Sequence, residues 1–469
     1  MSGQTHIVRK QTIELDLTGQ MSEALHWQRH LAVFARDVLP SSLERLFDRM
    51  APPGRVVSLE SLEVELDLEA AELSDETRLT EAILAKVSEA IAHQPIAGND
   101  GSSNPAGAGE APGTATEAHS VIGQFFFFLE NGQLPWYASQ SVRLDFEGAL
   151  QGVLASGKTK DEWQRRFRLL MQQPSARQRL AWQFSEQTLG AAAAFFFGAK
   201  SRELLDNQLF AKQLGKLLPS AAEPLKTAFW DVFFEKKLSG KALVEAALLR
   251  FLSQNPAQQE PLLGSLKANG QLALMASLGN RATEEQPKRP KPHPSQSPVP
   301  AEGIFVDNAG LVLLHPFLPI FLEELGVAEH GKITDAHKAV HLLQYLATGQ
   351  EAPPEHLLLL NKLLCGLPLD MPVKRRVKLR KQEKAEARRL LEAAIGHWEA
   401  LGKSSVENLQ GSFLCREGKL TKDALGWRLL VAPMAWDVLM DGLPWGIGVV
   451  KLPWMEEILV VEWNAGNYG

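Results

Sequence analysis

The chain has 469 residues, of which 45% are hydrophobic and 22% charged, as is ordinary for a soluble globular protein. This composition excludes a collagen-like, a wholly disordered and a multi-span membrane protein. Lysine and arginine total 49 against 55 aspartates and glutamates, a formal charge of −6. The chain therefore lacks the strong basic excess of a general nucleic-acid binder. Its length suggests about three domains.

The sequence holds two cysteines, Cys365 and Cys415, too few for a zinc cluster or a disulfide framework. We expect a reducing cytoplasm and two buried thiols, because both cysteines stand among apolar residues. The N-terminus lacks the apolar core of a signal peptide. The most apolar stretches, at 121–129 and 191–197, are far shorter than the roughly 20 residues of a membrane helix.

Two linkers divide the chain. Residues 97–120 are rich in Gly, Ala, Ser and Pro, and residues 281–302 are rich in Pro. The sequence therefore predicts three domains, at 1–96, 121–280 and 303–469. The expected fold class is mainly α with α+β terminal domains: a small N-terminal α/β unit, a central helical bundle and a C-terminal helical plus antiparallel β domain.

The first domain is predicted as a β-α-α-β unit. Apolar and acidic residues alternate at 13–17 and 62–68, which is typical of strands with one solvated face. Pro40 is expected to end the first helix, and Ser41 with Glu44 to form a capping box for the next. Residues 1–95 hold 9 basic and 16 acidic side chains, a charge of −7 that a solvated sheet face explains without a basic partner.

The other two domains are predicted to be rich in helices. Helical spacing marks the second domain at 161–171, 176–189, 203–218, 223–234 and 242–251. In the third, helices are expected at 335–347, 353–366 and 373–401, and Ser404 with Glu407 suggests another capping box. Alternating residues then predict strands near 427–431, 447–449 and 458–463.

Signatures of catalysis are weak. The sequence has no nucleophile elbow, phosphate-binding loop or zinc-protease motif, and we assign no catalytic, cofactor-binding or metal-ligating residue. His26 with His30, and His337 with His341, have the i,i+4 spacing of metal ligands on a helix. A structural role for both pairs is favoured, because imidazoles commonly lie at helix surfaces and core edges.

Residues 374–389 (KRRVKLRKQEKAEARR) hold nine basic and two acidic side chains on a predicted helix. The run is either a solvated helix start or a surface for an acidic partner, such as the chain's own first domain, or for phosphates. The candidate partner patch comprises Lys374, Arg375, Arg376, Lys378, Arg380 and Lys381.

Five tryptophans recur every nine residues through the C-terminal β region: Trp427, Trp436, Trp445, Trp454 and Trp463. Core anchors are favoured over an aromatic binding platform.

Several strings of the third domain resemble a known family. They are NAGLVLLHPF at 308–317, HLLQYLATG at 341–349, LNKLLCGLP at 360–368, SVENL at 405–409, FLCREG at 413–418, LPW at 443–445 and KLPWM at 451–455. Together with HIVRKQTIELDL and LESLEVELDL in the first domain and FFFLENGQLPWYA at 126–138, they resemble the tape measure proteins of contractile injection systems, which are phage-tail-like particles of bacteria.

The resemblance implies a non-enzymatic assembly protein that associates with tube and baseplate proteins and helps to determine tube length. It implies no cofactor, no membrane partner and no nucleic acid, with assembly in the cytoplasm and a place in the tube lumen. A cytoplasmic scaffold or chaperone for tube, baseplate or cargo components is the alternative. The residues matched by the motifs are Asn308, Gly310, His315, Pro316, Phe317, Gln344, Tyr345, Asn361, Lys362, Cys365, Gly366, Pro444, Trp445, Pro453 and Trp454.

As a single helix the chain would reach roughly 700 Å, but its prolines, strands and linkers exclude that form. Two modes of action stay open: a chain that is drawn out as a ruler, and a folded assembly factor.

Overall fold

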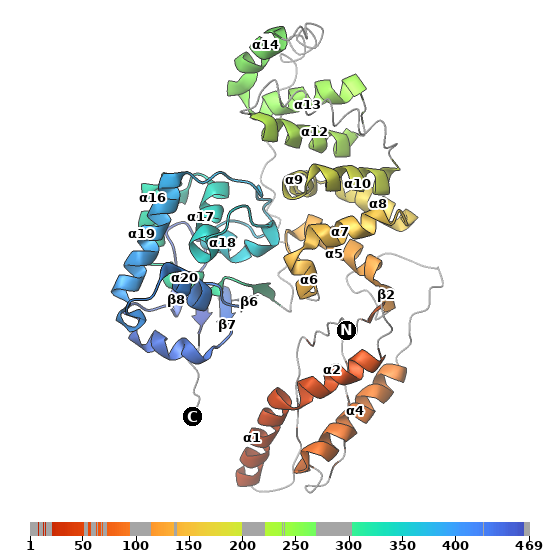
Figure 1. Ribbon diagram of the computed structural model, residues 1–469, viewed down its shortest axis with the longest axis vertical. Coiled ribbons are helices and arrows are strands. Elements are labelled where there is room, and N and C mark those ends of the chain that lie inside the picture. Colours follow the sequence, from red (N-terminus) through yellow and green to blue (C-terminus); the bar gives the residue numbers. More distant parts are fainter. Residues whose placement is uncertain are drawn as a thin grey trace. The chain divides into compact units, whose positions relative to one another are not determined.

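The computed structural model divides into two compact units (Figure 1), Met1–Gly123 with Ser139–Leu144, and Gln124–Ala138 with Asp145–Gly469. The residues described are 8, 13, 15, 21–50, 55–57, 62, 64–66, 68, 73–93, 114–135, 138–198, 221–236, 238, 240–268, 303–424 and 426–463. The predicted fold class, mainly α with β structure towards the C-terminus, is confirmed. Most of both predicted linkers lies outside these residues, and the three-domain division stays a prediction.

The smaller unit packs three helices, α1 (Met21–Asp37), α2 (Leu39–Met50) and α4 (Glu76–His93). Their apolar sides form a common core that includes Phe34, Leu43 and Leu79. A short antiparallel pair joins β1 (Arg55–Val57) to β2 (Thr114–Thr116). The short helix α6 (Gln140–Leu144) also belongs to this unit, and α5 (Glu117–Asn131) passes from it into the larger one.

Several local predictions for this unit were wrong. Helix α2 begins at Leu39, so Pro40 lies in its first turn, where a missing N–H is tolerated, and Ser41 donates to Val38 O instead of capping the helix. The described residues of the predicted strands at 13–17 and 62–68 are not in strands, and the remaining positions lie outside the described part. Helix α4 has no counterpart among the predicted elements.

The larger unit begins with helices, and the predicted helical character of residues 121–280 is confirmed where these residues are described. After α5 they are α7 (Phe146–Ala155), α8 (Asp161–Leu170), α9 (Pro174–Gln183), α10 (Glu186–Phe197), α12 (Ala222–Lys236), α13 (Gly240–Gln254), η2 (Pro256–Gln258) and α14 (Gln259–Ala268). The predicted helix at 176–189 is two helices, because Ser185 caps α10 through Thr188 N. The predicted helix at 203–218 lies outside the described residues.

Residues 303–463 form the C-terminal segment of this unit. Its helical elements are η3 (Ala309–Leu314), α16 (Leu318–Glu324), α17 (Ala336–Thr348), η4 (Glu355–Leu357), α18 (Leu359–Leu364), α19 (Lys381–His397), η5 (Glu399–Leu401), α20 (Val406–Leu409), η6 (Gln410–Leu414) and η7 (Ala435–Gly442). Its strands are β3 (Ile304–Val306), β4 (Ala328–Glu329), β5 (Lys332–Ile333), β6 (Gly418–Asp423), β7 (Gly426–Val431), β8 (Val449–Val450) and β9 (Leu459–Glu462).

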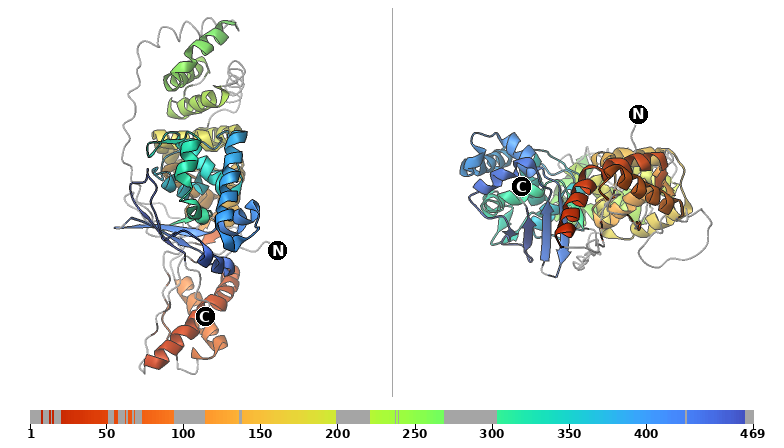
Figure 2. Two further views of the ribbon diagram at one scale, coloured as in Figure 1. Left: turned by 90° about the vertical axis from the view of Figure 1, so that its left-hand side faces the viewer. Right: turned by 90° about the horizontal axis from the view of Figure 1, so that it is seen from below.

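Five of these strands form one sheet in the order β3-β6-β7-β9-β8. The sheet is mixed instead of wholly antiparallel, because β9 runs parallel to β7, with Trp427 opposite Leu459. One face is buried through residues such as Ile304, Leu420 and Leu429. In the left view of Figure 2 the teal helices of the segment lie on one side of this sheet.

The predicted helix at 373–401 was wrong at its start, because α19 begins only at Lys381 and residues 373–380 are not helical. Contacts from distant residues hold this stretch, as described below. At the next helix, Ser405 is the N-cap of α20 instead of Ser404, and its hydroxyl accepts from Asn408 N.

The five periodic tryptophans make contacts within the C-terminal segment, but Trp436 is exposed, so the favoured interpretation as core anchors was wrong for that residue. Trp427 is buried in β7. The other four donate their indole N–H groups within the C-terminal segment, to Ser412 O, Leu313 O, Leu364 O and the Asp437 carboxylate. Such bonds satisfy the polar end of each ring while its apolar body packs.

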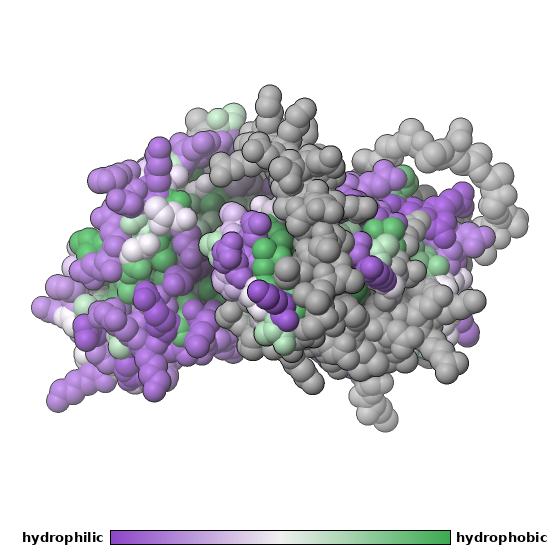
Figure 3. All heavy atoms as spheres, turned by 90° about the horizontal axis from the view of Figure 1, so that it is seen from above, coloured by the Kyte–Doolittle hydropathy of each residue, from purple (hydrophilic) through white to green (hydrophobic). Residues whose placement is uncertain are grey.

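None of the described helices is both long and apolar enough to cross a membrane. On the face shown in Figure 3, hydrophilic side chains cover most of the described surface and hydrophobic ones occupy smaller areas.

Gly310 lies where the backbones of η3 and η6 meet. A Cβ added there would overlap the Phe413 carbonyl oxygen, which belongs to a fixed backbone. We expect Gly310→Ala to destabilise the protein by about 3 kcal/mol, because neither backbone can move without disturbing the core. The matched control is Gly396→Ala in α19, where nothing lies within 4 Å; it should be neutral or slightly stabilising. Urea unfolding of the two variants measures the difference, and similar midpoints would contradict the close approach.

Candidate functional site

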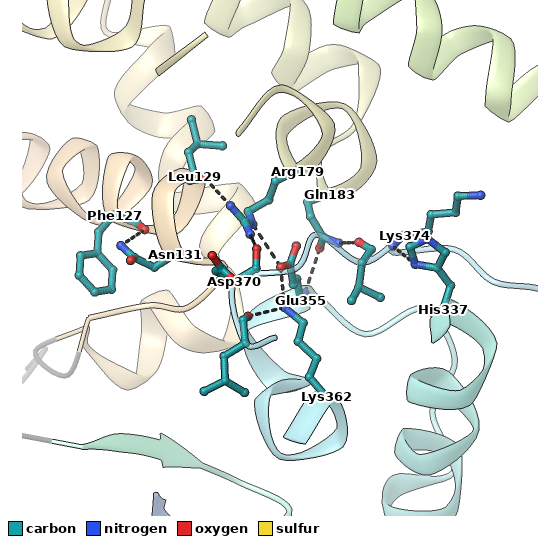
Figure 4. A network of polar contacts seen from close by, with 12 residues as sticks. Phe127, Leu129, Asn131, Arg179, Gln183, His337, Glu355, Lys362, Asp370 and Lys374 are labelled. Atoms are coloured by element: carbon teal, nitrogen blue, oxygen red, sulfur yellow. Dashed lines mark hydrogen bonds and ion pairs between the residues drawn. The ribbon is translucent and has the colours of Figure 1, made fainter. Parts of the chain in front are cut away.

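A buried cluster of three charges lies where α9 meets the C-terminal segment (Figure 4). Arg179 of α9, Glu355 of η4 and Lys362 of α18 all have fully buried side chains. Arg179 Nε donates to Glu355 Oε1 at 3.1 Å, and Lys362 Nζ donates to the same oxygen at 2.7 Å. Elements that are far apart in the sequence are thus held by one carboxylate oxygen.

Backbone carbonyls complete the cluster. Arg179 donates to Leu129 O and, at 2.6 Å, to Asp370 O, while Lys362 donates to Leu369 O at 2.9 Å. These acceptors matter because the cluster holds two cations and one anion, and burial of an unpaired charge is costly. Burial lowers the pKa of Lys362, and the neighbouring Glu355 carboxylate opposes that shift.

Glycine makes room for the cluster. Gly132 has a positive φ of 73°, and a Cβ there would meet Glu355 Oε1 and the Arg179 guanidinium. Both Leu129 and Gly132 belong to the string FFFLENGQLPWYA, and Lys362 belongs to LNKLLCGLP. Two of the strings that carry the family resemblance therefore meet at this cluster.

Gln183, one helical turn after Arg179, extends the junction. Its side chain accepts from Glu355 N at 2.9 Å and donates to Val373 O at 2.6 Å. Arg375 donates to Gln183 O at 2.8 Å and to the Glu147 carboxylate of α7 at 2.9 Å. The helical elements and the C-terminal segment are thus joined by directional bonds along one side of α9 and by Arg375.

The pair His337 and His341, considered above as metal ligands, holds the backbone of Lys374 instead. His341 Nε2 lies 2.6 Å from Lys374 O, and Lys374 N donates to His337 Nδ1 at 3.4 Å. His337 also makes an edge contact with Trp182 of α9. These bonds fix residues 373–375 outside a helix, which explains the late start of α19. Within the described ranges, no three His, Cys, Asp or Glu residues are grouped to hold a metal.

Burial lowers the pKa of His337 to about 4; the Lys374 charge and His341 act in the same direction, and Asp335 and Glu355 oppose it. Burial also lowers the pKa of His341. Both rings are therefore neutral near pH 7, and a neutral His337 can accept the Lys374 N–H.

A second polar cluster joins α9 to the helices that follow. Arg177 binds Asp231 of α12 at 2.8 Å and Glu235 at 3.2 Å, and Arg250 of α13 binds the same two carboxylates. Because Arg177 and Arg179 stand two residues apart on α9, this helix is bonded to different partners on different sides.

Three residues of the resembling strings form a buried amide cluster. Asn308 donates to Gln344 Oε1 at 2.9 Å and to Asn361 Oδ1 at 2.6 Å, and Asn361 donates to Val340 O. The cluster links the start of η3 with α17 and α18. Directional bonds of this kind specify one arrangement of these elements.

The other candidate residues also lie at packing points of the C-terminal segment. Phe317 makes an edge contact with Trp445, and His315 Nδ1 lies 3.0 Å from Val312 O. Gly366, at φ 65°, lies against the Trp454 carbonyl, and Pro453 lies near Gly331. Tyr345 is partly buried under Lys384, whereas Pro316 and Pro444 are exposed.

The two cysteines differ in their exposure to solvent. Cys365 is buried, as predicted, and burial raises the pKa of its thiol. Cys415 is exposed, so its predicted burial was wrong; it follows Leu414 at the end of η6, where the chain leaves the core, and donates to Ala347 O.

The candidate partner patch is not on a helix except at Lys381, the first residue of α19. Lys374, Arg376, Lys378, Arg380 and Lys381 are exposed, and Arg375 is half-buried against Glu147. Arg376 lies 3.9 Å from Glu223 of α12.

Sequence reasoning missed Arg179, Glu355, Arg177 and the buried pair Arg416–Asp437, whose closest contact is 2.7 Å. The sequence does indicate burial for two charged residues. Lys362 stands among leucines in LLNKLLC, and Arg416 follows an apolar run. For Arg179 and Glu355 the flanking residues give no such signal, because their partners are distant in the sequence.

The described polar residues thus form buried ion pairs and amide hydrogen bonds that join separate elements of the fold. A family model described as contractile injection system tape measure protein matches residues 5–463, nearly the whole chain. The chain matches no curated protein and no solved structure. The chain belongs to the contractile injection system tape measure protein family, as the motifs predicted. Its role is therefore in setting tube length, and membership implies association with tube and baseplate components.

The buried cluster holds two cations and one anion, so substitution of the anion and of one cation should affect stability unequally. Glu355→Gln leaves two buried cations without an anion and should destabilise the protein by about 3–5 kcal/mol. Lys362→Met leaves the Arg179–Glu355 pair intact and should cost only about 1 kcal/mol. Chemical denaturation of the purified chain gives both values. Glu392→Gln, which removes an exposed pair with Arg388, is the control and should change stability by less than about 0.5 kcal/mol. A larger loss from Lys362→Met than from Glu355→Gln would contradict this assignment.

The lowered pKa of His337 predicts a loss of stability in acid. Between pH 6.5 and 4 the unfolded ring binds more protons than the folded one, so stability falls as the pH falls through that range. His337 should account for on the order of 2 kcal/mol after allowance for its partial exposure. Thermal melts from pH 7 to 4 should show a shallower acid loss for His337→Gln, whereas the exposed His330→Gln should follow the parent curve. Parallel curves for all three proteins would rule out the His337 contribution.

Proposed function

We propose that this protein acts in tube-length determination as a folded body, not as a chain drawn out along the tube. In this role it binds tube and baseplate proteins through surfaces that its fold creates, and it carries out no chemical reaction. Assembly in the cytoplasm and a final place in the tube lumen stay predictions from the family.

The supporting observation is the buried Arg179–Glu355–Lys362 cluster. Extension of the chain would separate these residues and break the junction between α9 and the C-terminal segment. It would also expose a core that extends from β3 to β9. Such a core stabilises one compact arrangement over an extended one.

The lengths of the helices support the same mode of action. The longest described helix, α4, has 18 residues and spans about 27 Å. A ruler requires a long continuous helix, and here helices end at capping and turn residues such as Gly198 and Gly349, which have positive φ.

Particle length tests this proposal when the number of residues is kept constant. Particles that carry Glu355→Gln should show a broadened length distribution or a lower yield by electron microscopy, because the fold is weakened while the residue count is unchanged. Particles with Glu392→Gln should keep the parental length. Immunoblots of the assembling cells confirm that both variants are present at similar amounts.

A second experiment changes the residue count within the predicted linker at 97–120. An insertion of about 40 Gly/Ser-rich residues at 97–113 should leave tube length unchanged if the protein acts as a folded body. A chain drawn out along the tube would instead lengthen it by up to about 130 Å, at about 3.3 Å per extended residue. Lengthening of this kind, with sharp parental lengths for Glu355→Gln, would establish a ruler instead.

A further inference from the structure

The segment 374–380, here called the basic segment, has an alternating pattern of exposure. Lys374, Arg376, Lys378 and Arg380 are exposed, whereas Arg375 and Val377 are partly buried and Leu379 is buried. After a bend at Arg375, this period of two is that of an extended chain with one face towards the protein. Every residue on the outward face is a cation.

At its centre, the backbone of the basic segment has no hydrogen-bond partner among the described residues. In the part of the chain described, residues 377–379 make no hydrogen bond, through either backbone or side chain. Both ends are fixed: the two histidines hold Lys374, and Arg380 N donates to Glu383 Oε2 at 2.6 Å. A held, extended segment with free N–H and C=O groups resembles the edge of a sheet, which can pair with another chain.

The outward charges are largely uncompensated. Lys374 and Lys378 make no ion pair with any described residue, although Lys374 Nζ lies 5.8 Å from the Trp182 ring. Arg376 is 3.9 Å from Glu223, and both side chains are about two-thirds exposed, so this pair contributes little. Of the four outward cations, only Arg380 has a close ion-pair partner within the described ranges, Glu383 at 2.8 Å. The inward Arg375 is neutralised by Glu147.

We propose that the basic segment binds an extended acidic segment of another protein of the injection particle, which adds to it as a strand. Carboxylates at every second position of that partner would recur at about 6.6–6.8 Å, the spacing of the outward cations. The unpaired backbone groups favour a protein strand over a nucleic acid, because a strand can bond to them. The net charge of −6 also disfavours a long nucleic acid, which would extend beyond the basic segment onto acidic surface. The inference rests on the proposed function, because a drawn-out chain would not present this segment.

Binding of synthetic peptides to the purified full chain tests the proposal. The probe is a short peptide that alternates glutamate with valine; the comparison peptide has the same composition with its glutamates in one block. The alternating peptide should bind more tightly than the comparison peptide. Two further peptides carry methyl groups on the backbone nitrogens of the odd or of the even residues, and one of these two should bind about fivefold more weakly than the unmethylated peptide. Equal affinity for the two peptides, or no effect of methylation in either register, would overturn strand addition.

Variants of the protein locate the binding surface. The double variant Arg376→Glu with Lys378→Glu should lower the affinity for the alternating peptide at least about tenfold. Lys403→Glu, an exposed lysine beyond α19, is the matched control and should leave affinity unchanged. Melting temperatures check that each variant is folded. Unchanged affinity in the double variant, or tighter binding of single-stranded DNA than of the peptide, would overturn the assignment. Peptide binding and tube length are separate measurements, so failure of one proposal is distinguishable from failure of the other.

Discussion

Burial of Glu355 between two cations is the constraint on which the larger unit depends. A carboxylate in an apolar interior is stable only with close partners, and here those partners come from α9 and α18. The same helix α9 carries Gln183, which fixes the backbone of Glu355 and Val373, and Arg177, which binds α12. Placement of one helix therefore determines how the helical elements and the C-terminal segment pack.

The strings that carry the family resemblance act mainly through this packing. Leu129, Gly132 and Lys362 lie at the charged cluster, and Asn308, Gln344 and Asn361 form the amide cluster. Polar groups in these positions are directional, so they select one arrangement where apolar contacts alone would permit several. The motifs thus specify how these elements of the fold are arranged.

The basic segment shows how tertiary contacts override a local preference. Its residues have good helix propensity, and the run continues into the real helix α19 without a break in composition. However, His341 binds Lys374 O, Gln183 binds Val373 O, and Arg375 reaches Glu147. These bonds replace the helical ones at 373–375 and leave a cationic edge instead of a solvated helix.

Local patterns in the sequence determined the central helices, the end of α17 at Gly349, and strands β7 and β9. They also determined the family. Each of these features depends on capping residues, periodicity or motifs that lie within a few residues of one another. Weak patterns failed at α4, β3 and β6, where short elements depend on partners for their conformation. The parallel pairing of β7 with β9, the late start of α19 and the cluster around Glu355 were decided by the tertiary structure. Each of these depends on residues that are distant in the chain, and no local pattern of charge or hydrophobicity specifies which distant residues will meet.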